Sequence, residues 1–152
     1  MDLTATKKRY LLSIALLKDH PQQTFRPIEL AIRLGVSRAS VSRMILSFVK
    51  TGLLAQNRHG YRLTSAGLLQ IEDSLQQYEQ YFHFYTTVLH LSKYDAQECS
   101  ISLLSSAETQ TLRHLSHSVS SFLLKCSDHW DPSFTILAYS FAHRPAEYNV
   151  LY

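Results

Sequence analysis

Gly35 lies between two amphipathic stretches of sequence and is the residue there that can adopt a left-handed backbone conformation at little steric cost. Val36 and Ser37 follow it, and Val41 comes four residues after Ser37. A serine flanked in this way by apolar residues is typical of a helix N-cap with a hydrophobic staple. Residues 26–50 therefore predict a helix, a tight turn and a second helix, the order found in a helix-turn-helix motif.

The second of these helices is expected to have two different faces. Four apolar residues recur at helical spacing and should pack inward: Val41, Met44, Ile45 and Phe48. The cap and the opposite face carry the residues that we expect to contact DNA: Ser37, Arg38, Ala39, Ser40, Ser42 and Arg43. Small side chains let a helix approach a groove closely, and arginine reaches phosphates or the edge of guanine. An ordinary solvated face is the alternative interpretation, which the surrounding turn and hairpin disfavour.

A short hairpin, the wing, is expected directly after this helix. Gly52 is suited to end the helix, and residues 53–55 and 61–63 are expected to pair as strands around the polar tip NRHG. Such a wing could lie along a phosphate backbone. Arg58 is its expected contact, and His59 is either a second contact or a plain turn residue.

Two helices are expected before the turn, the first helix of the motif and one helix preceding it. Residues 6–18 show helical apolar spacing, and Pro21 should break that helix because the residue before a proline disfavours helical angles. Pro27 is suited to the first position of the next helix, where its missing N–H group costs nothing. The residues of that helix expected to face inward are Ile28, Ala31 and Leu34.

Charge is distributed unevenly along the chain. Residues 1–66 hold 11 lysines and arginines against three acidic residues, a net charge of +8, whereas residues 67–152 hold four against nine, a net charge of −5. A basic segment that carries a helix-turn-helix is suited to double-stranded DNA as its partner. We therefore expect a winged helix-turn-helix DNA-binding domain in residues 1–66 and a helical dimerisation or effector domain in residues 67–152.

One long helix is expected from Thr64, as its N-cap, to about His90. Its apolar residues alternate at spacings of three and four, which is a heptad pattern: Leu68, Ile71, Leu75, Tyr78, Phe82, Tyr85 and Leu89. These seven residues, called the seam below, could pack on the rest of their own chain or on a second copy. We expect a homodimer, because helix-turn-helix proteins that read palindromic sites are usually dimers.

Further helices are expected in the second half of the chain, one capped by Asp95 and running to about Ser105, one over residues 107–124, and a short one from Asp131 to Phe141. The residues of the middle helix expected inside are Leu112, Leu115, Val119 and either Phe122 or Leu123. The predicted fold is mainly α with a small β-wing: an N-terminal winged helix-turn-helix, a long dimerisation helix and C-terminal helices.

With these elements in order, the chain resembles the DtxR/MntR family of metal-responsive transcriptional repressors over about residues 6–115. The resemblance is carried by RYLLSIALL, ELAIRLGVSRASVSRMILSFVKTGLL, GYRLTSAG and LSKYDAQECSISLLSSAET. The first three motifs are shared with other winged-helix families such as the MarR group, and the last is more specific. The resemblance implies a DNA-binding transcriptional regulator, a repressor in that family, that acts as a homodimer.

The same family binds Mn²⁺ or Fe²⁺ through its first helix, its long helix and the helix after that. By position, the resemblance places these ligands on Arg9 and Leu12, near Gln77 or Tyr78, and on Cys99, Ser102 and Leu103. Of these residues, only Cys99 is of a type that the family uses as a ligand at its position. A hard divalent cation needs several carboxylates and imidazoles at once. We therefore expect no such metal site and no cofactor.

Two alternatives remain open. A metal or small ligand could bind at a rebuilt site in the helical domain, since three pairs have ligand-like spacing: His83 with His90, His114 with His117, and Cys126 with His129. Isolated pairs of this kind are weak evidence, because a zinc site usually has four ligands. From a different class, a winged helix can also serve as a protein-interaction module.

Catalysis and membrane insertion are not expected. The chain has no G-x-S-x-G, H-E-x-x-H or P-loop sequence, which are common motifs of hydrolases, metalloproteases and nucleotide-binding enzymes. It has no apolar run near the ~20 residues that a membrane span requires, and MDLTATKKRY does not have the pattern of a signal peptide. With only two cysteines, a cytoplasmic protein is the expectation.

Overall fold

A computed structural model describes residues 3–126 of the 152-residue chain. Within this range the chain forms two compact units, one ending at Glu72 and the other beginning at Asp73. The predicted division into domains at residue 66 and the roles assigned to the two domains stay predictions. The short helix expected from Asp131 to Phe141 lies outside the described residues.

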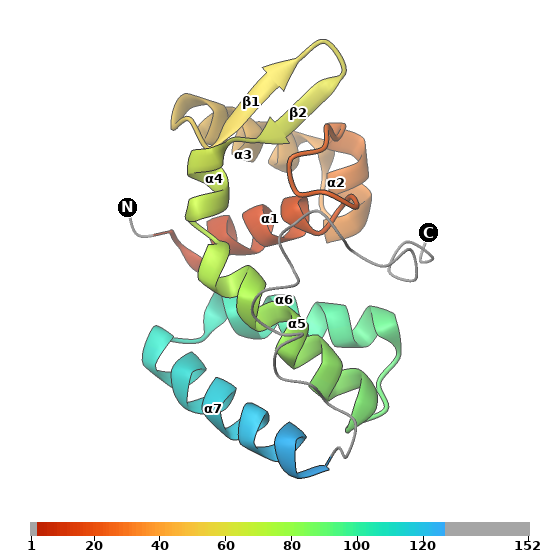
Figure 1. The fold of residues 1–152 in the computed structure, drawn as a ribbon. Coiled ribbons are helices and arrows are strands. Elements are labelled where there is room, and N and C mark those ends of the chain that lie inside the picture. The colour runs from red at the N-terminus through yellow and green to blue at the C-terminus, as the bar shows by residue number, and fades with distance from the viewer. Residues whose placement is uncertain (1–2, 127–152) are drawn as a thin grey trace. The chain divides into compact units, whose positions relative to one another are not determined.

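The first unit consists of short helices and one hairpin, the wing (Figure 1). Its elements are α1 (Ala5–Ala15), α2 (Pro27–Leu34), α3 (Arg38–Lys50), β1 (Leu54–Asn57), β2 (Gly60–Leu63) and α4 (Ser65–Leu69). Helix α1 contacts α2, α2 contacts α3, α3 contacts β1, and α4 contacts β2. The predicted fold class, mainly helical with an N-terminal helix-turn-helix and a two-stranded wing, is confirmed.

The core of the first unit takes side chains from three helices and both strands. Its buried apolar residues include Leu11, Leu12, Phe25, Leu30, Val41, Ile45, Phe48, Leu54 and Leu63. The predicted inward face of α3 is confirmed, except that Met44 is only half-buried. The prediction for α2 was partly wrong, because Leu30 is fully buried whereas Ile28 and Leu34 are half-buried. The eight residues of α2 contain two overlapping apolar stripes, and the sequence alone does not decide which of the two faces the core.

Helices α2 and α3 end in the same way, on glycines with left-handed backbone angles. Gly35 has a φ of 62° and Gly52 a φ of 74°. In both cases the N–H of the residue after the glycine donates a hydrogen bond to a carbonyl of the helix. Val36 N donates to Ala31 O at 3.2 Å, and Leu53 N donates to Phe48 O at 2.9 Å. This bond is the mark of a Schellman motif. The left-handed turn predicted at Gly35 and the helix end predicted at Gly52 are confirmed.

Helix α1 ends at Ala15, three residues before the predicted end at Lys18. Lys18 lies in the following loop, where its Nζ donates a hydrogen bond of 2.6 Å to Glu29 Oε1. Glu29 Oε2 accepts a second bond, of 2.7 Å, from Arg26 N at the start of α2. Burial by itself would raise the pKa of Glu29, but these hydrogen bonds and the nearby positive charges hold it below its ordinary value. The ion pair thus joins the loop after α1 to α2.

The wing is a tight antiparallel hairpin. Asn57 pairs with Gly60, so that Arg58 and His59 form a two-residue turn between the strands. Two-residue connections are the commonest in hairpins, because their twist matches that of the strands. The predicted strands are confirmed, and both extend further toward the turn than the sequence indicated.

A contact that the sequence did not predict joins the loop before α2 to the wing. Phe25 N donates to Tyr61 O at 2.8 Å, and Tyr61 N donates to Phe25 O at 2.9 Å. The neighbouring Gly60 has a φ of 145°, and a Cβ atom there would overlap the carbonyl oxygen of Phe25. Glycine is therefore required at this position both by the backbone conformation and by the close approach of a second chain segment.

The single helix predicted from Thr64 to about His90 was wrong, because the helix is interrupted after Leu69. Thr64 does cap the first piece, α4, since its Oγ1 accepts a hydrogen bond of 3.0 Å from Gly67 N. After α4, Ile71 N bonds to Leu68 O at 3.0 Å, three residues back instead of four. This tighter turn ends the regular helix, and the side chain of Ile71 is buried.

The described part of the second unit contains three helices, α5 (Glu72–Thr87), α6 (Lys93–Ser106) and α7 (Thr109–Cys126). Polar contacts join α5 to α7. The hydroxyl of Tyr81 donates to Leu112 O at 3.1 Å and lies 2.9 Å from Ser116 Oγ, and Gln80 Nε2 donates to Ser116 O at 2.6 Å. Burial raises the pKa of Tyr81, and the bond to Ser116 offsets this only in part, so the tyrosine stays protonated at neutral pH.

Two predictions for these helices need correction. Helix α6 is capped by Ser92, whose Oγ accepts from Asp95 N at 3.1 Å, and Asp95 lies in the first turn instead of at the cap. In α7, Leu115 is 38% exposed although it was expected inside. The reason is that the side of α7 containing Leu112 and Ser116 faces α5. The other predicted inward residues, Leu112, Val119 and Leu123, are buried, and Phe122 is exposed.

We predict that Gly60→Ala destabilises the first unit more than Gly52→Ala does. Both positions have a positive φ, which costs alanine roughly 1–2 kcal/mol. A Cβ at Gly52 meets nothing within 4 Å, whereas at Gly60 it meets backbone. Chemical denaturation should therefore show that Gly60→Ala lowers the free energy of unfolding by at least about 1 kcal/mol more than Gly52→Ala does. Equal losses in the two variants would contradict the close approach at Phe25.

Candidate nucleic-acid interface

The residues of α3 expected to contact DNA lie opposite its buried side. Four of them are exposed, namely Arg38, Ala39, Ser42 and Arg43, while Ser37 is exposed at the cap and Ser40 is half-buried. The helix therefore presents two arginines and several small side chains on one accessible surface. This is the surface chemistry that a helix needs in order to enter the major groove of DNA.

The first turn of α3 is fixed by its own serines. Ser37 Oγ accepts a hydrogen bond of 3.2 Å from Ser40 N, which confirms Ser37 as the N-cap, and the two hydroxyl oxygens lie 2.9 Å apart. The staple predicted between Val36 and Val41 is only half present, since Val41 is buried whereas Val36 is 37% exposed. The serines thus hold the helix start in a defined conformation before any ligand binds.

The tip of the wing is held by Asn57. Its Oδ1 accepts a hydrogen bond of 2.8 Å from His59 N, and its Nδ2 donates one of 2.8 Å to Thr24 Oγ1. Arg58 and His59 are both exposed at this ordered tip. The sequence analysis treated Asn57 only as part of the turn, although an asparagine that bonds to the backbone two residues later is a known turn signal.

The base of the wing is joined to the end of α3 through Thr64. Its Oγ1 lies 2.7 Å from Gly52 O, and its N–H donates to Leu53 O at 3.1 Å. Thr64 was predicted only as a helix cap, so this second role is a new finding. Because the same residue caps α4 and bonds to the chain just after α3, the wing is held in a fixed position relative to α3.

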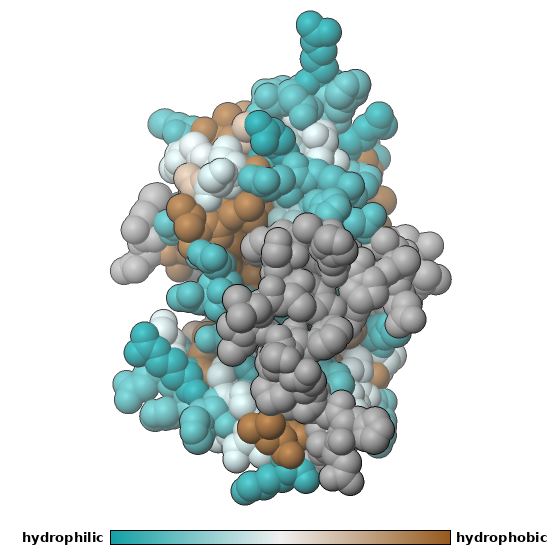
Figure 2. All heavy atoms as spheres, viewed as in Figure 1, coloured by the Kyte–Doolittle hydropathy of each residue, from teal (hydrophilic) through white to brown (hydrophobic). Residues whose placement is uncertain are grey.

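Positive charge dominates the exposed surface of the first unit. The exposed cationic residues of α3 and the wing include Arg38, Arg43, Lys50, Arg58 and Arg62. Figure 2 shows hydrophilic residues over the wing, at the top of the view. Glu29, one of the few acidic residues of this unit, is already paired with Lys18. The surface is therefore suited to a polyanion.

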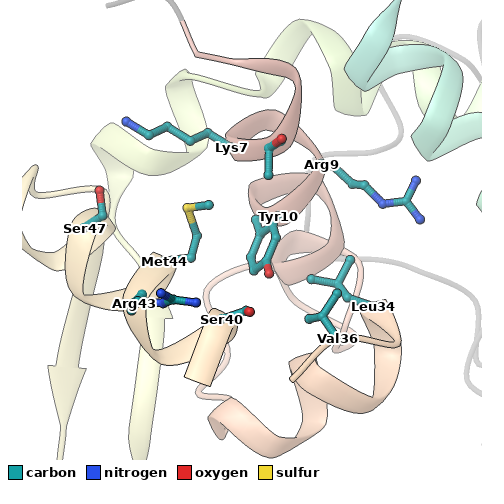
Figure 3. Close-up of a pocket in the computed structure, with 10 residues that line it drawn as sticks. Lys7, Arg9, Tyr10, Leu34, Val36, Ser40, Arg43, Met44 and Ser47 are labelled. Atoms are coloured by element: carbon teal, nitrogen blue, oxygen red, sulfur yellow. The ribbon is translucent and has the colours of Figure 1, made fainter. Parts of the chain in front are cut away.

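A pocket of about 590 Å³ lies beside this surface, between α1 and α3 (Figure 3). The ring of Tyr10 points into the space between the two helices, close to the side chains of Met44 and Arg43. Ser40 and Arg43 line the pocket and also belong to the predicted DNA-contacting surface. The pocket could not be predicted from the sequence, because its walls come from segments that are distant in the chain.

The residues considered as metal ligands do not come together in the described part of the chain. Among residues 3–126, no group of three or more histidine, cysteine, aspartate and glutamate side chains is placed to hold a metal ion. His83 lies 3.3 Å from Thr87 Oγ1 through its Nδ1, and burial lowers its pKa. The pair of Cys126 and His129 lies outside the described side chains.

The predicted dimerisation seam is partly covered within a single chain. Ile71, Leu75, Tyr78 and Phe82 are buried, Leu68 and Tyr85 are half-buried, and Leu89 is 50% exposed. Leu89 also lies beyond the end of α5. The part of the seam left for a second copy is therefore its two ends, and its role in a dimer stays a prediction.

No helix in the described part of the chain is both long and apolar enough to cross a membrane.

One family of known domains matches part of the first unit. Residues 14–58 match the IclR helix-turn-helix domain, a range that runs from the end of α1 to the turn of the wing. No curated protein matches the chain. Among solved structures, it is similar to the crystal structure of a hypothetical protein from Sulfolobus solfataricus, with a TM-score of 0.46, 18% identity, and coverage of 81% of this chain and 91% of that one. The chain thus contains a winged helix-turn-helix domain similar to that of IclR, a kind of domain used by DNA-binding transcriptional regulators.

Proposed function

We propose that this protein is a homodimeric transcriptional regulator, acting as a repressor, that binds double-stranded DNA through α3 and the wing. The observation that carries the proposal is the pair of exposed arginines, Arg38 and Arg43, on a helix whose start is capped by Ser37 and whose end is fixed by Gly52. Rigid placement matters because base-edge contacts depend on alignment, whereas phosphate contacts tolerate variation.

Helix α3 and the wing are assigned different contacts with DNA because their side chains differ. Ala39 and Ser42 are short and exposed, so the backbone of α3 can approach the floor of the major groove. Arg43 is then within reach of a guanine edge, since arginine forms two hydrogen bonds with guanine O6 and N7. Arg58 at the wing tip contacts a phosphate group, which adds affinity without reading sequence.

The first test compares two arginine variants. We predict that Arg43→Ala weakens binding to the specific site by about 1–3 kcal/mol and relaxes specificity at one position. Arg58→Ala should weaken binding to specific and random DNA alike and reduce the slope of log affinity against log salt by about one. Binding titrations over a range of salt concentrations measure both effects, after the preferred sequence has been selected from a random pool.

A matched control is Arg113→Ala, which removes one exposed arginine from α7 in the other unit. It should leave DNA affinity almost unchanged. Equal affinity of all three variants and the wild type, with no dependence on salt, would contradict DNA binding. It would favour the alternative in which the winged helix contacts another protein.

Dimerisation through the ends of the seam is the second part of the proposal. Four of its seven side chains are buried within one chain, so Phe82→Glu would disturb folding as well as association. Leu89, which is 50% exposed, offers a cleaner probe. A two-fold dimer would place the two α3 helices ~34–36 Å apart, the spacing of successive major grooves on one side of the duplex.

We predict that Leu89→Asp raises the dissociation constant of the dimer at least about tenfold, because a buried unpaired carboxylate is costly at an apolar interface. Sedimentation equilibrium measures the change, and circular dichroism checks that the variant is folded. Thr87→Asp, at an exposed position two residues earlier, is the control with the same added charge. An unchanged dimer in Leu89→Asp would exclude this end of the seam from the interface.

The regulator is further proposed to be a relative of the DtxR/MntR repressors that works without their Mn²⁺ or Fe²⁺ site. Of the positions that correspond to ligands in that family, Leu12 is buried in the core, Leu103 is apolar, and Arg9 carries a positive charge. Neither leucine nor arginine can donate a lone pair to a metal ion.

We therefore predict that millimolar Mn²⁺ changes neither the melting temperature nor the affinity for DNA, since a ligand stabilises only the state that it binds. Isothermal calorimetry and DNA titrations with and without Mn²⁺ decide the question. Saturable binding of one ion per chain, or a tenfold gain in DNA affinity, would show that other side chains build a metal site.

A further inference from the structure

The pocket between α1 and α3 combines positive charge with an apolar interior. Lys7 and Arg9 of α1 and Arg43 of α3 line it, and no acidic side chain is among the described residues that form its wall. Tyr10 and Met44 supply apolar surface from opposite sides (Figure 3). The guanidinium of Arg9 points away from Met44 and Arg43 (Figure 3), so Lys7 and Arg43 are the cations available to a ligand. A site with two cations and no carboxylate favours an anion, and its apolar walls favour a ligand that also has an apolar body.

The dimensions of the pocket agree with a small organic molecule. Its volume of about 590 Å³ lies inside the range of roughly 300–1,000 Å³ typical of small-molecule sites. Tyr10 is only 6% exposed, so its ring is a fixed wall and not a mobile surface group. The two helices that form the pocket belong to one unit and are joined through α2, which contacts both. The pocket is therefore formed before any ligand arrives.

We propose that this pocket binds a small organic anion with an aromatic or aliphatic body, a carboxylate being the simplest case, and that this anion competes with DNA. Competition follows from shared residues, because Ser40 and Arg43 line the pocket and also belong to the surface of α3 that faces DNA. The binding of the anion is independent of the proposed function, whereas the competition rests on it.

The concave shape favours a small molecule over a phosphate group of DNA. A duplex backbone is convex and would contact the rim of the pocket, where Arg43 is exposed and Lys7 is half-buried, without reaching its interior. A small aromatic carboxylate can place its ring against Met44 and the small exposed part of Tyr10, and its charge beside Arg43 or Lys7. Contact with an aromatic edge and with a thioether both add to the burial of apolar area.

The experiment uses 2-naphthoate as the probe and 2-naphthamide as its neutral counterpart. Calorimetry on the full chain should show saturable binding of one naphthoate per chain and binding of the amide at least about tenfold weaker, since the charged contact is lost. In a DNA titration at constant ionic strength, naphthoate should raise the apparent dissociation constant for DNA by a factor that grows linearly with its concentration, as competition requires, and the amide at the same concentration should raise it far less.

Two variants locate the site. Met44→Trp fills the pocket, and Lys7→Glu reverses a charge on its wall, so each should weaken naphthoate binding at least about tenfold. Lys125→Glu, an exposed lysine of α7 in the other unit, is the control for net charge. Lys7→Glu leaves the packing of α3 unchanged, so it keeps the test decisive if Met44→Trp perturbs the helix.

The outcomes separate this proposal from the proposed function. Naphthoate binding that is lost in Lys7→Glu supports the pocket even if the protein binds no DNA, and in that case only the competition fails. No saturable binding at millimolar naphthoate, or binding unaffected by both variants, would overturn the proposal. The proposal would also be overturned if Lys7→Glu lost DNA affinity while the wild type bound no naphthoate. The pocket wall would then be part of the DNA contact.

Discussion

The position of α3 depends on two left-handed glycines, Gly35 before it and Gly52 after it. At each glycine the chain reverses direction while its N–H groups satisfy the last carbonyls of a helix, so both turns are held by hydrogen bonds as well as by packing. Any other residue would raise the free energy of the folded state by roughly 1–2 kcal/mol at either position. Helix α3 is thus held at a fixed angle because its ends are fixed.

The wing depends on a different constraint, the close approach of backbone segments. Gly60 passes against the carbonyl of Phe25, and Gly67 in α4 passes against the carbonyl of Leu53. A side chain at either position would push two segments apart. Thr64, between these glycines, bonds to the residues that follow α3. The three positions together explain why the hairpin and α3 form one rigid surface.

Local signals in the sequence predicted much of the first unit. The caps at Ser37 and Thr64 and the turn at Gly35 each arise from neighbouring residues, so a short window was sufficient. What the sequence did not reveal depends on distant partners. The bridge between Phe25 and Tyr61 joins segments far apart in the chain. The pocket likewise needs two helices to be placed side by side, and the exposure of Leu115 follows from the stripe by which α7 faces α5.

The seam shows that the period of a pattern can be read from the sequence while its packing partner cannot. Spacings of three and four require an apolar stripe on a helix, but they do not say whether that stripe packs on its own chain or on a copy. Here Leu75 and Phe82 are buried within one chain, and the helix breaks near Ile71. A continuous two-stranded coiled coil is therefore excluded over this stretch. A dimer that used this pattern would therefore rely on separate patches at its ends, and its stability would depend on a few side chains such as Leu89 instead of on the whole helix.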